Sequence, residues 1–141
     1  MTKIEPYIFF EGRGEEAIEF YKQALGAQVE MIMRYGESPE PPPPDMVKPG
    51  SENKIMHSSI VVEGQRIMIS DGGCSGKSEI GGFSLSLTVP SEADAKRYFD
   101  GLSQGGQVQM PLGKTFFSSC FGMVQDKFGV GWMIMAEPQQ K

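Results

Sequence analysis

The sequence predicts an α+β fold made of two tandem βαβββ modules. The first observation behind this prediction is a duplication, because residues 17–31 resemble residues 95–110 at an offset of 78 that becomes 79 after one insertion. The second is a change of period: in both copies, apolar residues recur at helical spacing and then, after a glycine, alternate as in a strand. Since the offset is close to half of the 141 residues, we expect a repeated unit.

The first module is expected to contain four strands and one helix. Gly26 can end the helix as a C-cap, and Glu63-Gly64 supplies the positive φ that a two-residue hairpin loop requires. The expected elements are a strand at 4–10, a helix at 15–25, and strands at 28–35, 54–62 and 66–70.

The second module repeats this order. Ser91 precedes its helix as an N-cap with Asp94 three residues later, and the stretch from Asp126 to Gly129 suits a type I turn. The expected elements are a strand at 83–89, a helix at 92–102, and strands at 107–112, 119–125 and 131–135. We therefore expect a single domain over 1–141, with modules at 1–71 and 82–141 joined by a glycine-rich linker at 72–81.

Residues 36–53 lie outside this plan. The segment is too rich in proline for regular structure and is expected to be an extended or irregular loop. A plain surface insertion is one interpretation, and a lid or an arm that contacts a partner is the other.

Composition and charge exclude several classes of protein. The fractions of hydrophobic residues (39%) and charged residues (22%) are typical of soluble domains, and no apolar run approaches the ~20 residues that span a bilayer. The chain starts without a secretion signal, so we expect a cytoplasmic protein with no membrane partner. A net charge of −5 opposes nucleic-acid binding. Cys74 and Cys120 are far apart in sequence and are expected to be free thiols.

A set of motifs spans nearly the whole chain: Pro6 to Phe10, Glu16 to Tyr21, Leu25 to Ala27, His57, Ser70-Asp71, and Asp126 to Trp132. Together they resemble the PhnB-like (YjdN-type) branch of the vicinal oxygen chelate superfamily, which includes glyoxalase I, extradiol dioxygenases, and bleomycin and fosfomycin resistance proteins. The resemblance implies paired βαβββ modules whose curled, mixed sheets form a cleft. It also implies a homodimer, which would cover open sheet edges.

The resemblance also bears on metal binding. In metal-dependent members of the superfamily, histidine and carboxylate ligands come from the first and last strands of each module. The matching positions in this chain are Pro6 or Tyr7, Ile69 or Ser70, Phe83 and Met133. These side chains are poor ligands for a hard or borderline cation, and the chain has a single histidine. We therefore expect neither a metal nor another cofactor.

His57 and Asp71 are the candidate catalytic pair. They lie near the two ends of one hairpin, and a histidine beside a carboxylate can act in acid–base chemistry. A hydrogen-bonded structural histidine and a turn aspartate are the alternatives. Alternation along the strand predicts that His57 points into the cleft. The expected ligand-binding residues around it are Tyr7, Met68, Ser70, Phe83 and Met133.

Three functions follow from these observations. The first is a metal-free protein that binds a small, partly apolar molecule, because the former ligand positions are mostly apolar. The second is an enzyme that uses His57 with Asp71 as an acid–base pair. The third is a metal-dependent lyase or dioxygenase. A methyltransferase that uses S-adenosylmethionine is not expected, since the duplicated modules leave no room for a Rossmann-type unit.

Overall fold

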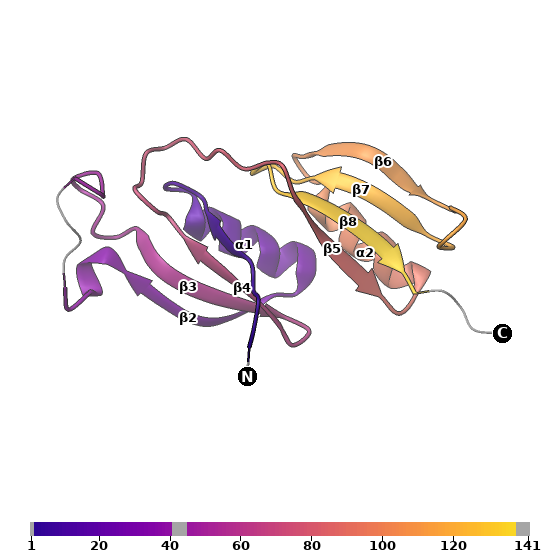
Figure 1. Cartoon of the computed structure of the whole chain (residues 1–141), viewed down its shortest axis with the longest axis horizontal. Helices are drawn as coiled ribbons and strands as arrows, with labels where there is room; N and C mark the ends of the chain where they lie inside the picture. Colours follow the sequence, from indigo (N-terminus) through magenta and orange to yellow (C-terminus); the bar gives the residue numbers. More distant parts are fainter. Residues whose placement is uncertain (1, 41–44, 138–141) are drawn as a thin grey trace. The chain divides into compact units, whose positions relative to one another are not determined.

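The computed structural model describes residues 2–40 and 45–137, which divide between Glu79 and Ile80 into two compact units. We describe each unit by itself (Figure 1). The first contains β1 (Tyr7–Phe9), α1 (Gly14–Leu25), β2 (Gln28–Arg34), the 3-10 turn η1 (Tyr35–Glu37), β3 (Ile55–Val62) and β4 (Gln65–Ser70). The second contains β5 (Ser84–Val89), α2 (Glu92–Leu102), β6 (Gln107–Gly113), β7 (Phe121–Gln125) and β8 (Gly131–Ala136).

The two sheets have the same topology. The strand order is β1-β4-β3-β2 in the first unit and β5-β8-β7-β6 in the second. In each, the first strand pairs in parallel with the last, and the remaining pairs are antiparallel. The predicted α+β fold with repeated βαβββ order is therefore confirmed.

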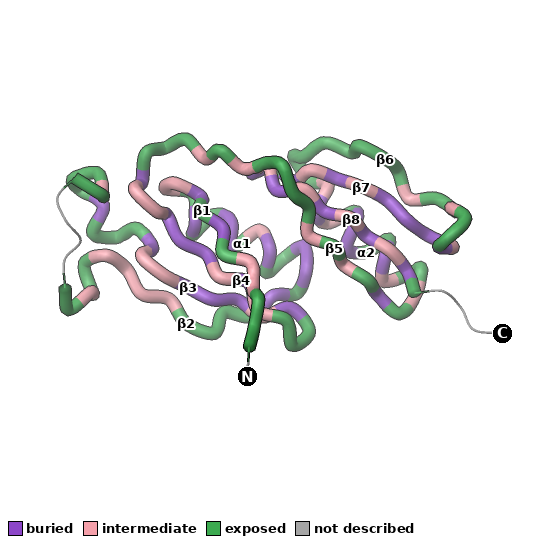
Figure 2. The backbone as a smooth tube through the Cα atoms, viewed as in Figure 1, coloured by how far each residue is buried: buried purple, intermediate pink, exposed green. Residues whose placement is uncertain are grey.

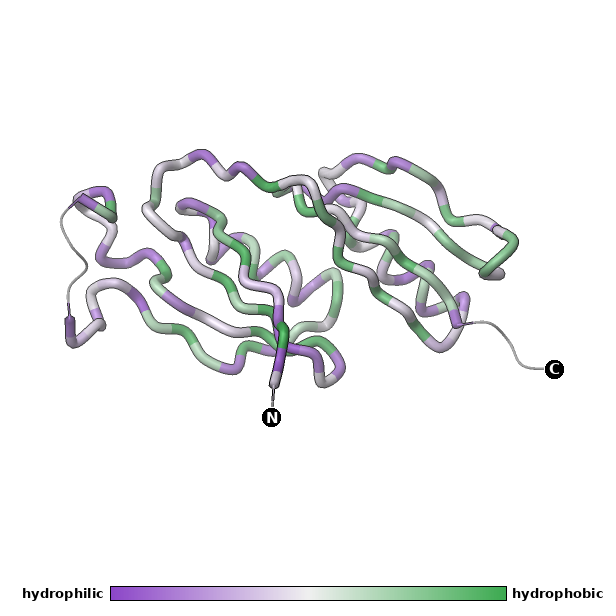
Figure 3. Tube along the Cα trace, viewed as in Figure 1, coloured by the Kyte–Doolittle hydropathy of each residue, from purple (hydrophilic) through white to green (hydrophobic). Residues whose placement is uncertain are grey.

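One helix covers one face of each sheet. Helix α1 packs on β3 and β4, and α2 packs on β8, β7 and β5. The buried residues of Figure 2 accordingly lie along the inner turns of the helices and the central strands, and the strands of the second unit are mostly hydrophobic or neutral in Figure 3. Trp132 is buried on the helix-facing side of β8, as alternation along that strand predicts.

The two helices begin in different ways. Ser91 caps α2 locally, because its side chain accepts a hydrogen bond from the backbone N–H of Asp94. Arg13, at the N-cap of α1, makes no such bond. The acceptor there is Asp71, whose Oδ1 accepts from the backbone N–H of Gly14 at 2.6 Å. A Cβ on Gly14 would lie 2.8 Å from that oxygen, so this close approach requires glycine.

The turn between β3 and β4 has the expected conformation. Glu63 and Gly64 both have positive φ, at 46° and 83°, as a type I′ hairpin requires.

Some boundaries differ from the prediction. Strand β1 is shorter than the expected 4–10, and its ladder starts after Pro6, which has no N–H to donate. Strand β7 begins at Phe121 instead of Ser119, because the backbone N–H of Cys120 donates to Ser118 Oγ at 3.1 Å. Within the proline-rich segment, residues 41–44 lie outside the described residues. None of the described helices is long and apolar enough to cross a membrane.

Candidate functional site

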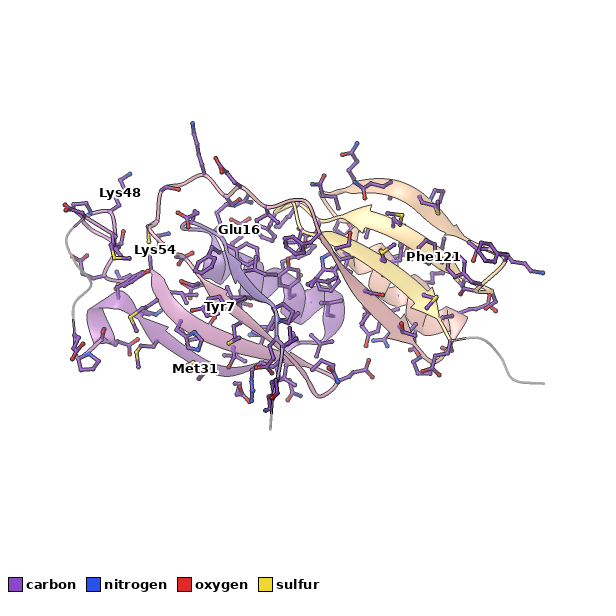
Figure 4. The ribbon with its side chains drawn as sticks, in the orientation of Figure 1. Tyr7, Glu16, Met31, Lys48, Lys54 and Phe121 are labelled. Carbon is purple, nitrogen blue, oxygen red and sulfur yellow. The ribbon has the colours of Figure 1, made fainter. Side chains whose placement is uncertain are left out.

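The face of the first sheet that points away from α1 carries most of the predicted site residues, and we call it the open face. One transverse row crosses all four strands, because Tyr7 pairs with Met68, Met68 with Ser59, and Ser59 with Met31. Figure 4 labels the two ends of this row, Tyr7 and Met31. Next to this row, on the same face, Phe9 of β1 pairs with Ser70 of β4, and Met33 of β2 pairs with His57 of β3.

A polar cluster joins three of these residues. The Tyr7 hydroxyl lies 2.9 Å from Nδ1 of His57, and the two rings are 5.5 Å apart. Ser70 lies close enough to lower the pKa of the Tyr7 phenol, and its Oγ accepts from the backbone N–H of Gly72 at 2.9 Å. Ser70 is buried, whereas Tyr7 is 40% exposed. The cluster therefore extends from a buried backbone amide to the surface of the open face.

A second tyrosine lies next to this cluster. The Tyr35 hydroxyl donates to the carbonyl of Gly72, and it also interacts with Ser70. Burial raises the pKa of both Tyr7 and Tyr35, and the hydrogen bonds with Ser70 oppose part of that rise. Both phenols consequently remain protonated at neutral pH.

An aromatic surface adjoins the polar cluster. The rings of Tyr7 and Phe9 are stacked, with their centroids 5.0 Å apart and their planes inclined by 16°. Phe9 is half exposed at 50%, so the edge strand β1 presents apolar ring surface to solvent. The thioethers of Met31, Met33 and Met68 extend this surface across the sheet.

An ionic network occupies another part of the open face. The Arg66 guanidinium donates to both carboxylate oxygens of Glu30, at 2.7 and 2.9 Å, and lies 3.3 Å from Glu5. The Ser59 hydroxyl donates to Glu30 at 2.7 Å. Hydrogen bonds from Arg66 and Ser59 lower the pKa of Glu30 to about 2, and Glu30 in turn raises the pKa of Arg66. This network ties β2, β3 and β4 together on the side that carries the cluster.

The carboxylate of Asp71 hydrogen bonds to backbone amides, whereas the sequence suggested His57 as its partner. Its carboxylate accepts from the backbone N–H groups of Gly12 at 3.0 Å, Gly14 at 2.6 Å and Ile55 at 2.7 Å, and it is buried. These bonds tie the start of β3 to the start of α1. The residue that hydrogen bonds to His57 is Tyr7. The arrangement thus gives Asp71 a structural position and gives the imidazole a phenol as its neighbour.

Two of the expected ligand-binding residues belong to the second unit. Met133 lies on the face of that sheet opposite α2, in a row in which Met110 pairs with Met123 and Met123 with Met133. Phe83 precedes β5 and is 48% exposed. The first unit therefore brings together Tyr7, His57, Met68 and Ser70, and the second unit carries Met133 and Phe83.

A cavity of about 410 Å³ also occurs in the first unit, at the start of α1. Its lining includes Lys48 and Lys54, both labelled in Figure 4, and the Lys54 ammonium donates to the carbonyl of Gly12 at 2.9 Å. The remaining lining residues come from the stretches 11–13, 49–51 and 74–76. None of the predicted site residues lines this cavity.

The residues of the open face do not fit the metal centre of the superfamily. Register places Tyr7 and Ser70 on the open face, while Ile69 is buried. A phenol, a hydroxyl and one imidazole form a poor donor set for a divalent cation. Within the described residues, no three histidine, cysteine, aspartate or glutamate side chains gather as such a site requires.

Sequence reasoning missed Phe9 and Tyr35 as site residues, and it missed the Arg66–Glu30 pair. Alternation from Tyr7 along the same strand could have found Phe9. Tyr35 follows β2 in η1, and its contact with Gly72 crosses 37 positions of sequence, so local patterns carry no signal for it.

Comparison with known proteins gives consistent results. The family model described as 3-demethylubiquinone-9 3-methyltransferase matches residues 2–135. Protein YjdN of Escherichia coli strain K12 is 37% identical over 144 residues, covering 97% of each chain. The crystal structure of protein PA1353 from Pseudomonas aeruginosa is 41% identical with a TM-score of 0.83, covering 99% of this chain and 100% of that one. A PhnB protein from Bacillus cereus is 32% identical with a TM-score of 0.74, covering 96% and 99%.

More distant structures share the fold alone. A glyoxalase-related enzyme from Fulvimarina pelagi has a TM-score of 0.60 at 17% identity, with 97% of this chain and 89% of that chain covered. The fosfomycin resistance protein FosX from Listeria monocytogenes has a TM-score of 0.63 at 9% identity, with 96% and 93% covered.

Proposed function

The chain belongs to the family described as 3-demethylubiquinone-9 3-methyltransferase, the PhnB- and YjdN-like branch of the vicinal oxygen chelate superfamily, and we propose that it binds a small, partly apolar molecule without a metal. The proposed site is the open face of the first unit, around Tyr7, His57, Met68 and Ser70. Phe83 and Met133 remain proposed ligand-binding residues of the second unit.

One observation carries this proposal. The stacked rings of Tyr7 and Phe9 are exposed at 40% and 50%, and the hydrogen-bonded pair of Tyr7 and His57 lies directly beside them. Small-molecule sites typically combine apolar surface with a few fixed polar groups. Exposed aromatic and thioether groups that gather on one sheet face also indicate a binding surface.

The family description does not imply methyl transfer by this chain. A Rossmann-type cofactor site needs neighbouring parallel strands and free amides at the turn into a helix. Among the described strands, each sheet has a single parallel pair, and the amides of Gly12 and Gly14 before α1 are bonded to Asp71. These residues do not fit S-adenosylmethionine in that mode.

Ligand screening by thermal shift tests the binding function, because a molecule that binds only the folded state raises the melting temperature. Compounds that stabilise the protein should lose their effect in Phe9→Ala and keep it in Phe117→Ala, a control of similar exposure in the second unit. Stabilisation that is equal in both variants would place the ligand elsewhere.

A second candidate function is an acid–base reaction at His57. The observation that favours it is the 2.9 Å contact between the Tyr7 hydroxyl and Nδ1, in which Tyr7 takes the part first expected of Asp71. If the protein is an enzyme of this kind, His57→Gln should abolish turnover of a bound compound while leaving its binding within a few-fold.

We also propose that the protein is a homodimer. Among the described strands, each sheet has two outer strands with one unpaired edge, β1 and β2 in the first and β5 and β6 in the second. Such edges are usually covered in stable proteins.

A further inference from the structure

The single histidine has a phenol as its neighbour, since the Tyr7 hydroxyl lies 2.9 Å from Nδ1 of His57. Beside this pair, the backbone N–H of Gly72 donates to Ser70 Oγ at 2.9 Å. A backbone amide can only donate, so Ser70 keeps its own proton for a neighbouring acceptor. Ser70 lowers the pKa of the Tyr7 phenol, as a nearby donor does.

The chemistry of the Tyr7 phenol and the His57 imidazole sets the direction of the hydrogen bond between them. Tyr7 keeps its proton, because its phenol is partly buried in the fold. A phenol O–H is a stronger donor than a neutral imidazole N–H, and an imidazole nitrogen is a stronger acceptor than a phenol oxygen. The bond consequently runs from the Tyr7 hydroxyl to Nδ1, and the ring proton lies on Nε2.

We propose that Tyr7 is a positioning residue that holds neutral His57 in the Nε2–H tautomer, so that the open face offers a hydrogen-bond donor and selects ligands that carry an acceptor. The acceptor is a carbonyl or another oxygen without a proton, next to a planar apolar group that can lie on the rings of Tyr7 and Phe9. This choice of ligand class rests on the proposed binding function, whereas the tautomer does not.

The single histidine makes the tautomer directly measurable. We would label the protein with ¹⁵N-histidine and record the ring resonances at a pH where the imidazole is neutral. The wild type should carry its proton on Nε2, with Nδ1 at the shift of a hydrogen-bonded acceptor. In Tyr7→Phe the Nδ1 resonance should move to the position of a nitrogen without a donor.

Tyr35→Phe is the matched control. It removes the hydroxyl of a neighbouring tyrosine that donates to Gly72, so the Nδ1 resonance should stay in place. A wild-type ring with its proton on Nδ1, or an Nδ1 resonance that is the same in Tyr7→Phe, would overturn the proposal. A two-dimensional amide spectrum of each variant separates these results from loss of the fold.

The ligand class is tested with two neutral single-ring probes, acetophenone as an acceptor and aniline as a donor. Acetophenone should shift the Nε2 resonance in the wild type and do so less in Tyr7→Phe, while aniline should have little effect. A larger effect of aniline would overturn the selection of acceptors. The other outcome is a wild type that shows the proposed tautomer while neither probe, at saturating concentration, shifts the ring nitrogen resonances of His57. That result would refute the binding function of the open face and leave the tautomer assignment intact.

Discussion

Asp71 caps a helix that begins 57 positions before it in the chain, because its Oδ1 accepts from the backbone N–H of Gly14 at 2.6 Å. The same carboxylate accepts from Gly12 and Ile55. Asp71→Ala should therefore lower the free energy of unfolding by about 3 kcal/mol, since several buried N–H groups lose their acceptor. The control is Asp45→Ala, which removes an exposed loop carboxylate and should change the free energy of unfolding by less than about 0.5 kcal/mol. Chemical denaturation measures the free energy of unfolding of both variants. Equal values would contradict the role of Asp71 as the cap of α1.

The Glu30–Arg66 pair should make stability depend on acidic pH. Hydrogen bonds from Arg66 and Ser59 hold the pKa of Glu30 at about 2 in the folded protein, below its ordinary 4.5. Glu30 therefore contributes stability that is present above pH 4.5 and is lost as the pH falls toward 2. Solvent screens this partly exposed pair, so the effect is modest. Urea titrations across this range should show a shallower pH dependence in Glu30→Gln than in the wild type, and identical slopes would disprove the assignment.

Ser70 should control the ionisation of two tyrosines. Its hydrogen bonds oppose the rise that burial causes in the pKa of Tyr7 and Tyr35. Ser70→Ala should thus shift the pKa of both phenols further upward, seen as a later rise of phenolate ultraviolet absorbance on alkaline titration. Because both values already exceed 10.0 in the folded state, the stability linked to these phenols is present below pH 10.0 and falls as the pH rises beyond it. An earlier rise in Ser70→Ala would show that the serine does not stabilise the phenolates.

Asp126 should fix the position of the Trp132 indole, the single tryptophan of the chain. Its Oδ2 accepts from the Trp132 indole N–H at 2.9 Å, and its Oδ1 accepts from the backbone N–H groups of Phe128 and Val130. Asp126→Ala should cost roughly 2 kcal/mol and change the Trp132 emission, because buried donors lose their acceptor. Asp100→Ala, at an exposed position of α2, is the control that should leave the emission unchanged. Emission and stability that stay at wild-type values in Asp126→Ala would exclude this role.

Light scattering tests the proposed dimer. A homodimer should have about twice the chain mass of 15.5 kDa at micromolar concentration. A mass that stays near 15.5 kDa up to the highest soluble concentration would refute it.

The sequence predicted local features well and long-range contacts poorly. Helix α2 has the bounds that its pattern indicated, because Ser91 caps it and its apolar period is complete within the segment. The length of β1 depends on pairing with β4, which no local pattern encodes. For the site, alternation along β3 places His57 and Ser59 on one face, and the pairing of the strands places Tyr7 and Met68 on the same face. The bonds from Asp71 to the amides of Gly12, Gly14 and Ile55 had no local signal, because proximity along a hairpin does not say on which side of the sheet a carboxylate lies.

The repeated topology leaves the two halves free to diverge. Each sheet is completed by its own first and last strands, so neither half needs the side chains of the other to form its hydrogen-bonded ladder. After an ancestral duplication, a substitution on the outer surface of one copy would leave the ladder of the second intact. In the present chain the two copies differ at this surface: the first presents a tyrosine and a histidine, and the second presents Met123 and Met133.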